Sequence, residues 1–152
     1  MSIVITRERP DTADAMALIA ELEAVLEPLY PSASRHGFSV EKLLNEGVAF
    51  FVLRYTGALT GCGGILLAGD VYGELKRMYI RPQFRGAGLG TALLHHLAAY
   101  AQEQGMRLLR LETGIYQTEA IRLYERYGFR RVPPFGLYRE DPLSIFYEKE
   151  IE

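Results

Sequence analysis

The chain has 152 residues, of which 49% are hydrophobic and 24% charged, a composition typical of a globular protein rather than a disordered or fibrous one. Its 17 basic and 19 acidic residues give a formal net charge of −2, so it lacks the positive excess typical of a general nucleic-acid binder. We expect a single domain over residues 1–152 that has no nucleic-acid partner.

The N-terminal third predicts a short strand followed by two helices. Residues 3–6 have strand composition, and a helix is predicted to open at Pro10-Asp11 and to end at Pro28 and Pro31. The apolar stripe of this helix consists of Leu18, Leu22, Val25, Leu26 and Leu29. A loop over residues 30–38 leads to a short helix that is capped by Ser39 and runs to about Asn45.

The next segment predicts three strands linked by hairpin turns, over residues 48–55, 58–68 and 72–80. The turns are Thr56-Gly57 and Gly69-Asp70. The second strand contains the glycines Gly61, Gly63 and Gly64. Glycines inside a strand predict a β-bulge or the close approach of a neighbouring backbone.

The second half alternates helices and strands. A glycine-rich loop leads to a helix over residues 89–104, whose stripe consists of Leu89, Leu93, Leu94, Leu97 and Ala101. The strand over residues 106–112 is apolar enough to be buried on both faces. After a loop over residues 113–118, a helix over 119–127 and strands over 129–132 and 144–151 complete the chain. This order favours a parallel pairing around the glycine loop.

The cysteine content and the N-terminus indicate the compartment. Cys62 is the only cysteine, so the chain forms no internal disulfide and no thiolate zinc site, and we expect no bound metal. Residues 1–7 lack the charged start and apolar core of a signal peptide, and no apolar run approaches the roughly 18–20 residues of a membrane span. We therefore expect a cytoplasmic protein without a membrane partner.

The glycine loop carries the clearest chemical signal. Glycines let backbone N–H groups approach a ligand, and the N-terminus of the following helix adds positive potential, so the loop predicts a phosphate cradle. A dinucleotide fingerprint would need glycine at Thr91, and a P-loop would need lysine after Gly90. A glycine-rich turn that serves only packing remains an alternative.

Three motifs resemble the GNAT superfamily of N-acetyltransferases. Its pyrophosphate motif, [Gln/Arg]-x-x-Gly-x-[Gly/Ala], matches residues 85–90, and residues 74–82 are similar to its fourth strand. Residues 120–129 match the family segment A-x-x-L-Y-x-x-x-G-F. The resemblance covers residues 48–150. It implies an α/β fold with a mixed, mostly antiparallel sheet, splayed open in the middle between the strands that end near Ile80 and Glu112, with helices on both faces.

The resemblance also implies an enzyme that uses acetyl-CoA as acyl donor. The pyrophosphate would bind the backbone amides of Arg85, Gly86, Ala87, Gly88, Leu89, Gly90 and Thr91. Met78, Tyr79 and Ile80 would pair with the pantetheine arm like an added strand, and the amide of Met78 would polarise the thioester carbonyl. Gln117 stands where many family members have an asparagine that touches pantetheine.

Acetyl transfer to an amine moves two protons, one from the ammonium and one to the leaving thiolate. Tyr124 matches the family tyrosine near the sulfur and is the expected acid; packing in the core is its alternative role. Glu74 is the preferred base, with binding of the acceptor ammonium as the alternative, and Glu112 at the end of the next strand is the second candidate. Cys62 has no neighbouring base in sequence and is expected to be a small buried residue. His95 and His96 are expected in packing or at the surface. His36, in the loop before the second helix, is expected to be a solvated loop residue, with contact to an acceptor as the alternative.

Residues 28–46 and 133–143 correspond to the segments that select the acceptor in this family. Four cations could bind an acceptor carboxylate, although ordinary surface charge is the preferred interpretation: Arg35, Lys76, Arg77 and Arg139. We expect transfer to a primary amine of a small-molecule or amino-acid-like acceptor in a ternary complex. A protein N-terminus or lysine as acceptor, and a non-catalytic acyl-CoA-binding regulatory module, are the alternatives. The aromatic strand over residues 144–151 could also pair across a homodimer.

Overall fold

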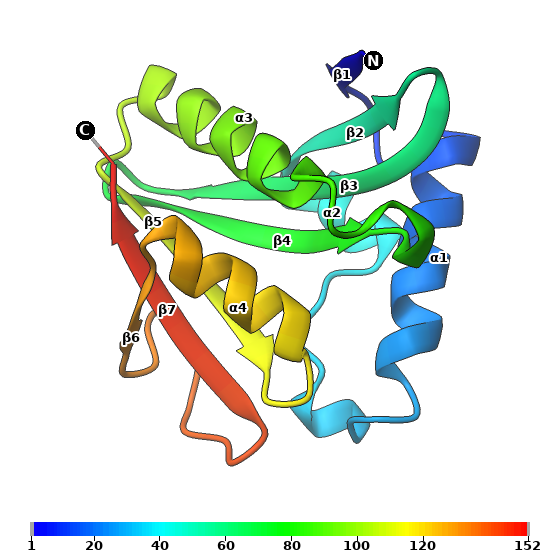
Figure 1. The fold of residues 1–152 in the computed structure, drawn as a ribbon. Coiled ribbons are helices and arrows are strands. Elements are labelled where there is room, and N and C mark those ends of the chain that lie inside the picture. The colour runs from blue at the N-terminus through cyan, green and yellow to red at the C-terminus, as the bar shows by residue number, and fades with distance from the viewer. Residues whose placement is uncertain (1, 152) are drawn as a thin grey trace.

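Seven strands form one mixed sheet in a computed structural model that describes residues 2–151 (Figure 1). They are β1 (Ile3–Arg7), β2 (Ala49–Tyr55), β3 (Ala58–Ala68), β4 (Tyr72–Ile80), β5 (Leu108–Gly114), β6 (Arg130–Val132) and β7 (Ser144–Glu150). Their order in the sheet is β1-β2-β3-β4-β5-β7-β6. Only β4 and β5 pair in parallel, so the expected mixed, mostly antiparallel architecture is confirmed.

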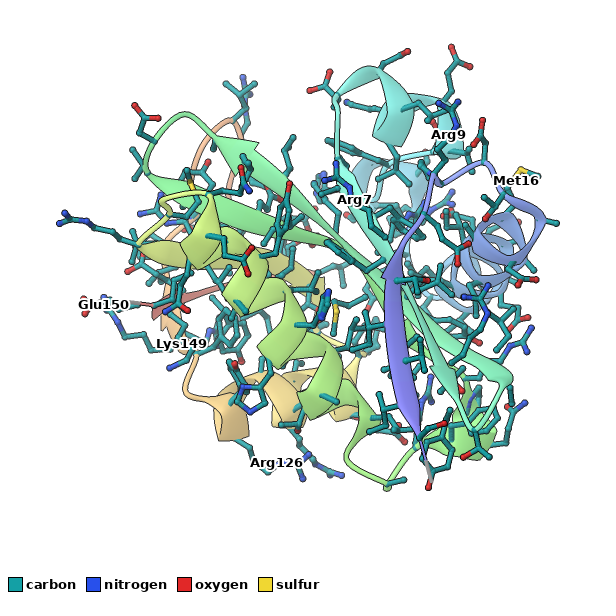
Figure 2. The ribbon with its side chains drawn as sticks, turned by 90° about the horizontal axis from the view of Figure 1, so that it is seen from above. Arg7, Arg9, Met16, Arg126, Lys149 and Glu150 are labelled. Atoms are coloured by element: carbon teal, nitrogen blue, oxygen red, sulfur yellow. The ribbon has the colours of Figure 1, made fainter. Side chains whose placement is uncertain are left out.

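Helices cover both faces of the sheet. On one face lie α1 (Ala13–Leu26) and α2 (Val40–Asn45), and on the other α3 (Leu89–Glu103) and α4 (Thr118–Tyr127); short 3-10 turns span Ser32–Ser34 and Pro82–Phe84. Seen from above, α3 and α1 flank the strands, with the exposed Met16 on α1 and Lys149 and Glu150 at the other end of the sheet (Figure 2). Because side chains alternate along a strand, β2 sends Phe50 and Val52 into the core beneath α1 and sends Phe51 and Leu53 into the core beneath α3.

The sheet opens between β4 and β5. These strands pair only over Tyr72–Glu74 and Leu108–Arg110 and then diverge towards their C-terminal ends, with α4 over the gap (Figure 1). A bulge in β4 accompanies the divergence, since Arg77 and Met78 lie opposite the single residue Gly63 of β3. Arg77 has φ +56°, a left-handed conformation that is strained for a residue with a side chain. The edge of β4 that faces β5 is therefore unpaired after Glu74.

Most predicted elements are confirmed, including the helix capped by Ser39, whose Oγ accepts the N–H of Lys42 at 3.1 Å. The predicted start of the first helix at Pro10-Asp11 was wrong. Thr12 caps α1 by accepting the N–H of Ala15, and the helix begins at Ala13. Its predicted stripe also extended too far. Val25 and Leu29 are 39% and 42% exposed, while the buried positions are Ala15, Leu18, Ile19 and Leu22.

Three further expectations need correction or refinement. The predicted strand over residues 106–112 is not buried on both faces: the side chains of β5 alternate between buried and half-buried, and the strand extends through Thr113 and Gly114. The glycines of β3 do lie beside irregular pairing, with one register shift towards β2 and one towards β4. Finally, β7 pairs with β5 on one side and β6 on the other, so it is not the free edge from which a homodimer was predicted.

Candidate active site

A cavity of about 310 Å³ lies where the sheet opens. Its lining comes from α1 and the following loop on one face, from α4 on the other, and from β4 and β5 between them. Because Leu75 packs into the core beneath α3, its strand neighbours Glu74 and Lys76 point to the face covered by α1. The cavity thus brings Tyr124 from α4 and Glu112 from β5 together with the side chains of β4.

Glu74 belongs to a buried three-residue cluster. Its Oε2 accepts a hydrogen bond from Tyr138 Oη at 2.5 Å and pairs with Lys76 Nζ at 3.0 Å. Lys76 Nζ also donates to Tyr138 Oη at 2.8 Å and lies 4.1 Å from the ring centroid of Phe38. Both charged side chains are less than 10% exposed. A buried pair of this kind needs both partners, because removing one leaves an uncompensated charge.

A second ionic cluster lies on the α1 side of the cavity. Glu23 accepts hydrogen bonds from Arg77 Nη2 and from Arg35 Nη1, both at 2.7 Å. Burial opposes ionisation of Glu23, but the two guanidinium groups outweigh it and hold the pKa of the carboxyl below its usual value. Arg77 Nε also donates to the carbonyl oxygen of Phe38, and Cys62 Sγ donates to the carbonyl oxygen of Arg77. These contacts hold the bulge of β4 in its left-handed conformation.

Glu112 differs from Glu74 because no cation pairs with it directly among the described residues. Burial raises the pKa of the Glu112 carboxyl, against the opposing effects of Ser144, His36 and Lys76, and the negative charge of Glu74 adds to the rise. A carboxylate with a raised pKa is a stronger proton acceptor than an exposed one. Glu112 therefore has the properties of a proton acceptor within the cavity.

Tyr124 lines the cavity from α4 and is only 5% exposed. Its ring packs against Phe129 and Tyr147, with centroid separations of 5.6 and 6.4 Å. Burial raises the pKa of the phenol, and the negative charge of Glu112 raises it further, so the hydroxyl keeps its proton at neutral pH. The position is compatible with both roles considered for Tyr124, packing in the core and proton donation into the cavity.

Gln117 precedes α4 and lines the same cavity. Its Oε1 accepts a hydrogen bond from Tyr30 Oη at 3.2 Å, and the same Tyr30 oxygen accepts the N–H of Tyr116 at 2.9 Å. Tyr30 packs closely over Gly114, where an added Cβ would lie 2.1 Å from its oxygen. Tyr30 therefore orients Gln117, a contact that the sequence did not reveal.

The glycine loop lies on the outside of the same region. Residues 85–88 are exposed, and Gly86 and Gly88 have φ +84° and +77°. Gly88 is the residue before α3 and has no side chain to cap the helix, so the N–H groups of Leu89, Gly90 and Thr91 have no partner within it. The amide of Arg85 instead donates to the carbonyl oxygen of Pro82, so the cradle of free donors begins at Gly86 and Ala87.

Gly90 serves packing as well. A Cβ at this position would lie 2.8 Å from Leu123 Cδ2, so the absent side chain lets the start of α3 approach α4. An ion pair of 3.2 Å between Arg85 and Glu119 joins the loop to α4 a second time. The glycine loop is thus fixed beside the helix that carries Tyr124. Of the predicted strand residues near this point, Met78 lines the cavity, while Tyr79 donates its hydroxyl to Glu21 and faces α1; Ile80 ends β4.

The minor candidates separate clearly. Cys62 is fully buried, and burial raises the pKa of its thiol to about 12, as expected for a packing residue. On α3, the ring of His95 contacts Tyr127 and the ring of His96 contacts Phe51, so the two histidines do not act together. His36 is different: it was expected to be solvated, but it is half-buried, lines the cavity and packs edge-on against Tyr138. Its position in the cavity is compatible with the alternative of an acceptor contact.

The cationic residues also differ from the preferred expectation of surface charge. Arg35, Lys76 and Arg77 line the cavity in ion pairs, whereas Arg139 is exposed and lies outside its lining. Tyr138 and Glu23 were missed as site residues because their partners are distant in sequence. Tyr138 lies 64 positions from Glu74 and Glu23 lies 54 from Arg77. The only available signal was that residues 133–143 were expected to select the acceptor.

No helix within residues 2–151 is long and apolar enough to cross a bilayer. Across that same described range, no group of three or more histidine, cysteine or acidic side chains is arranged to hold a metal ion.

Comparisons with known proteins identify the family. The model of the Acetyltransferase (GNAT) family matches residues 17–129. A protein of Azospirillum brasilense named IAA acetyltransferase is 40% identical over 151 residues, which covers 99% of both chains. The crystal structure of a candidate acyl-CoA N-acyltransferase from Klebsiella pneumoniae is 40% identical, covers 99% of this chain and 98% of its own, and superimposes with a TM-score of 0.84.

A more distant structure shows the same fold. The PaiA N-acetyltransferase of Thermoplasma acidophilum, solved in complex with coenzyme A, is 22% identical, covers 99% of both chains and has a TM-score of 0.75. The opened sheet and the glycine loop before α3 agree with the family that these similarities indicate. The chain belongs to the GNAT family of acetyltransferases.

Proposed function

We propose that the protein transfers an acetyl group from acetyl-CoA to a primary amine of a small, amino-acid-like acceptor, by direct attack in a ternary complex. The observation that carries this proposal is the cavity at the opening of the sheet. It places a tyrosine from α4 and carboxylates from β4 and β5 around one space, beside a cradle of free backbone donors. The coenzyme A in the Thermoplasma structure and the names of the relatives support acetyl-CoA as the donor.

The donor would bind along the opening. Its pyrophosphate suits the cradle over residues 86–91, where amides and the helix N-terminus offer positive potential. Its pantetheine arm suits the edge of β4 after Glu74, which has no strand partner on the side of β5 and can accept an extended chain. A backbone amide near Met78 would then polarise the thioester carbonyl, an effect worth about 3 kcal/mol per donor. The residues present fit the group.

Tyr124 would protonate the departing thiolate. Its hydroxyl keeps its proton because burial and the charge of Glu112 both raise the pKa of the phenol. A neighbouring donor lowers the barrier to departure of the thiolate by giving it a proton. Cys62 offers no competing covalent route, because it is the only cysteine, is fully buried and has a raised pKa.

For the base, the geometry favours Glu112 over Glu74, which reverses the preference of the sequence analysis. Glu74 is already engaged by Lys76 and Tyr138, so its negative charge is committed within the protein. Glu112 has no such cation partner among the described residues, and burial raises its pKa, which makes its carboxylate a stronger base. We assign proton removal from the acceptor to Glu112 and assign Glu74 to holding Lys76 and Tyr138.

The test is thiol release from acetyl-CoA in the presence of amines, amino acids and short peptides with free N-termini or lysines. We expect thiol release only when a small primary amine is present, with the acetylated amine identified by mass. Acetylation of the peptides alone would support a protein acceptor instead. Binding of acetyl-CoA by calorimetry without transfer to any acceptor would favour a regulatory module that binds acyl-CoA without catalysis.

A further inference from the structure

The cavity holds more charge than acetyl transfer requires. Three cations and three carboxylates line it: Arg35, Lys76, Arg77, Glu23, Glu74 and Glu112. Most of these groups satisfy one another. The question is which of the three cations remains accessible to a ligand.

Two of the three cations are fully engaged. Lys76 Nζ has three oxygen partners, in Glu74, Tyr138 and the carbonyl of His36. The side chain of Arg77 is only 6% exposed, and it bonds to Glu23 and to the carbonyl of Phe38. Both residues therefore shape the site, and neither is free to bind an acceptor.

Arg35 is the exception. Its Nη1 pairs with Glu23, but its Nε is buried and has no hydrogen-bond partner. Glu23 is shared by two guanidinium groups, so this cluster carries one positive charge in excess. Ser34, the neighbour of Arg35, is held by Asp141 at 2.7 Å, which fixes the loop that presents the arginine. The α1 side of the cavity is thus positive, and Arg35, whose side chain is 25% exposed against 6% for Lys76 and Arg77, is its accessible cation.

The β5 wall of the cavity is negative, because Glu112 has no cation in direct contact within the described residues. We propose that Arg35 binds a carboxylate of the acceptor, so that the substrate is a zwitterion whose carboxylate lies at Arg35 and whose amine lies at Glu112. This inference rests on the proposed function and narrows it to the class of amino acids. Guanidinium groups suit carboxylates, and Arg77 offsets the repulsion between Glu23 and the incoming carboxylate.

The experiment compares each protein amino acid with its methyl ester in the thiol-release assay. The amine of the ester is less basic, so chemistry alone favours the ester at neutral pH. We expect the free acid to have the higher kcat/KM for the accepted side chains. A charge-assisted hydrogen bond of this kind corresponds to a preference of about ten- to a hundredfold. Arg35→Gln should abolish that preference, and Arg35→Lys, which keeps the charge but lacks the planar guanidinium, should weaken it.

The matched control is Arg139→Gln, because Arg139 is exposed and does not line the cavity. It should keep the preference of the parent protein. If the parent protein acetylates the esters as efficiently as the acids, the carboxylate subsite is overturned while the proposed function stays intact. Unchanged preference in Arg35→Gln would overturn the role of Arg35.

A binding measurement covers the case in which no amine is acetylated, which would contradict the proposed function itself. Calorimetry of the CoA-loaded protein with N-acetyl amino acids and their methyl esters reports the carboxylate subsite without turnover. Binding of the acids that is lost in Arg35→Gln would support the subsite. Equal binding of acid and ester, or binding of neither, would overturn it. Thermal melting of each variant, together with its affinity for acetyl-CoA, shows that the fold is retained.

Discussion

The glycine loop and the charged cavity both contact α4 but are built in opposite ways. The loop offers backbone N–H groups from one short, exposed segment. The cavity gathers buried side chains from α1, the following loop, β4, β5 and the loop over residues 133–143. A backbone cradle recognises what all acyl-CoA donors share. Paired side chains can differ from one chain to the next without disturbing that cradle, so we expect substitutions in the two regions to have separable effects.

The largest effect is expected at the proposed base. Loss of a general base lowers a rate by about 10²- to 10⁴-fold, so Glu112→Gln should show a loss of this order in kcat/KM at neutral pH. The pKa of Glu112 is raised by burial, so the rate of the parent protein rises with pH as this carboxyl loses its proton. In Glu112→Gln the rising limb should move up towards the pKa of the acceptor amine, and the loss should shrink at high pH.

Glu74→Gln is the matched comparison for the pH profile, because both carboxylates line the same cavity. Glu74→Gln should alter KM, because Lys76 and Tyr138 lose the carboxylate that holds them. The rising limb of the pH–rate profile should stay where it is in the parent protein. If the limb moves in Glu74→Gln and not in Glu112→Gln, the base is Glu74, as the sequence analysis expected.

The next effect concerns stability. Lys76→Met leaves the Glu74 carboxylate buried without its cation, which costs about 3–5 kcal/mol in the free energy of unfolding. Urea denaturation measures this directly. The double variant Lys76→Met/Glu74→Gln should recover most of the cost, because it removes both charges of the pair. A cost below about 1 kcal/mol at neutral pH would show that the pair behaves as an exposed one.

A smaller effect is expected at Tyr124. Tyr124→Phe keeps the ring contacts with Phe129 and Tyr147 and removes only the hydroxyl. The single-turnover rate should fall about a hundredfold, or about 2.7 kcal/mol, while the Kd for acetyl-CoA stays close to that of the parent. Single-turnover measurement is needed because slow product release would mask the chemical step. An unaltered rate would leave Tyr124 as a core residue only.

The contrast between the regions also explains what the sequence could predict. The glycine loop is a contiguous segment with local conformational needs, so its glycines and the following helix are visible in the sequence, and the stripe of α3 is buried as expected. The cavity depends on pairs such as Tyr138 and Glu74, which only the folded sheet brings together. The bulge at Arg77 was missed on β4 because arginine is not a residue that signals a left-handed conformation.

The smallest effect, and the most local, separates two neighbouring glycines of the loop. At Gly88 a Cβ would meet no atom within 4 Å, so Gly88→Val should leave the packing intact and obstruct the proposed pyrophosphate cradle. We expect calorimetry to show acetyl-CoA binding weaker by about tenfold, or about 1.4 kcal/mol. At Gly90 a Cβ would lie 2.8 Å from Leu123 Cδ2, so Gly90→Val should lower Tm by separating α3 from α4.

Because Gly88 has φ +77°, any side chain there adds strain of about 1–2 kcal/mol. Gly47→Val controls for that strain, since Gly47 has φ +69° and equally open surroundings at the end of α2. A folded Gly88→Val protein that binds acetyl-CoA as tightly as Gly47→Val would remove the pyrophosphate from this loop.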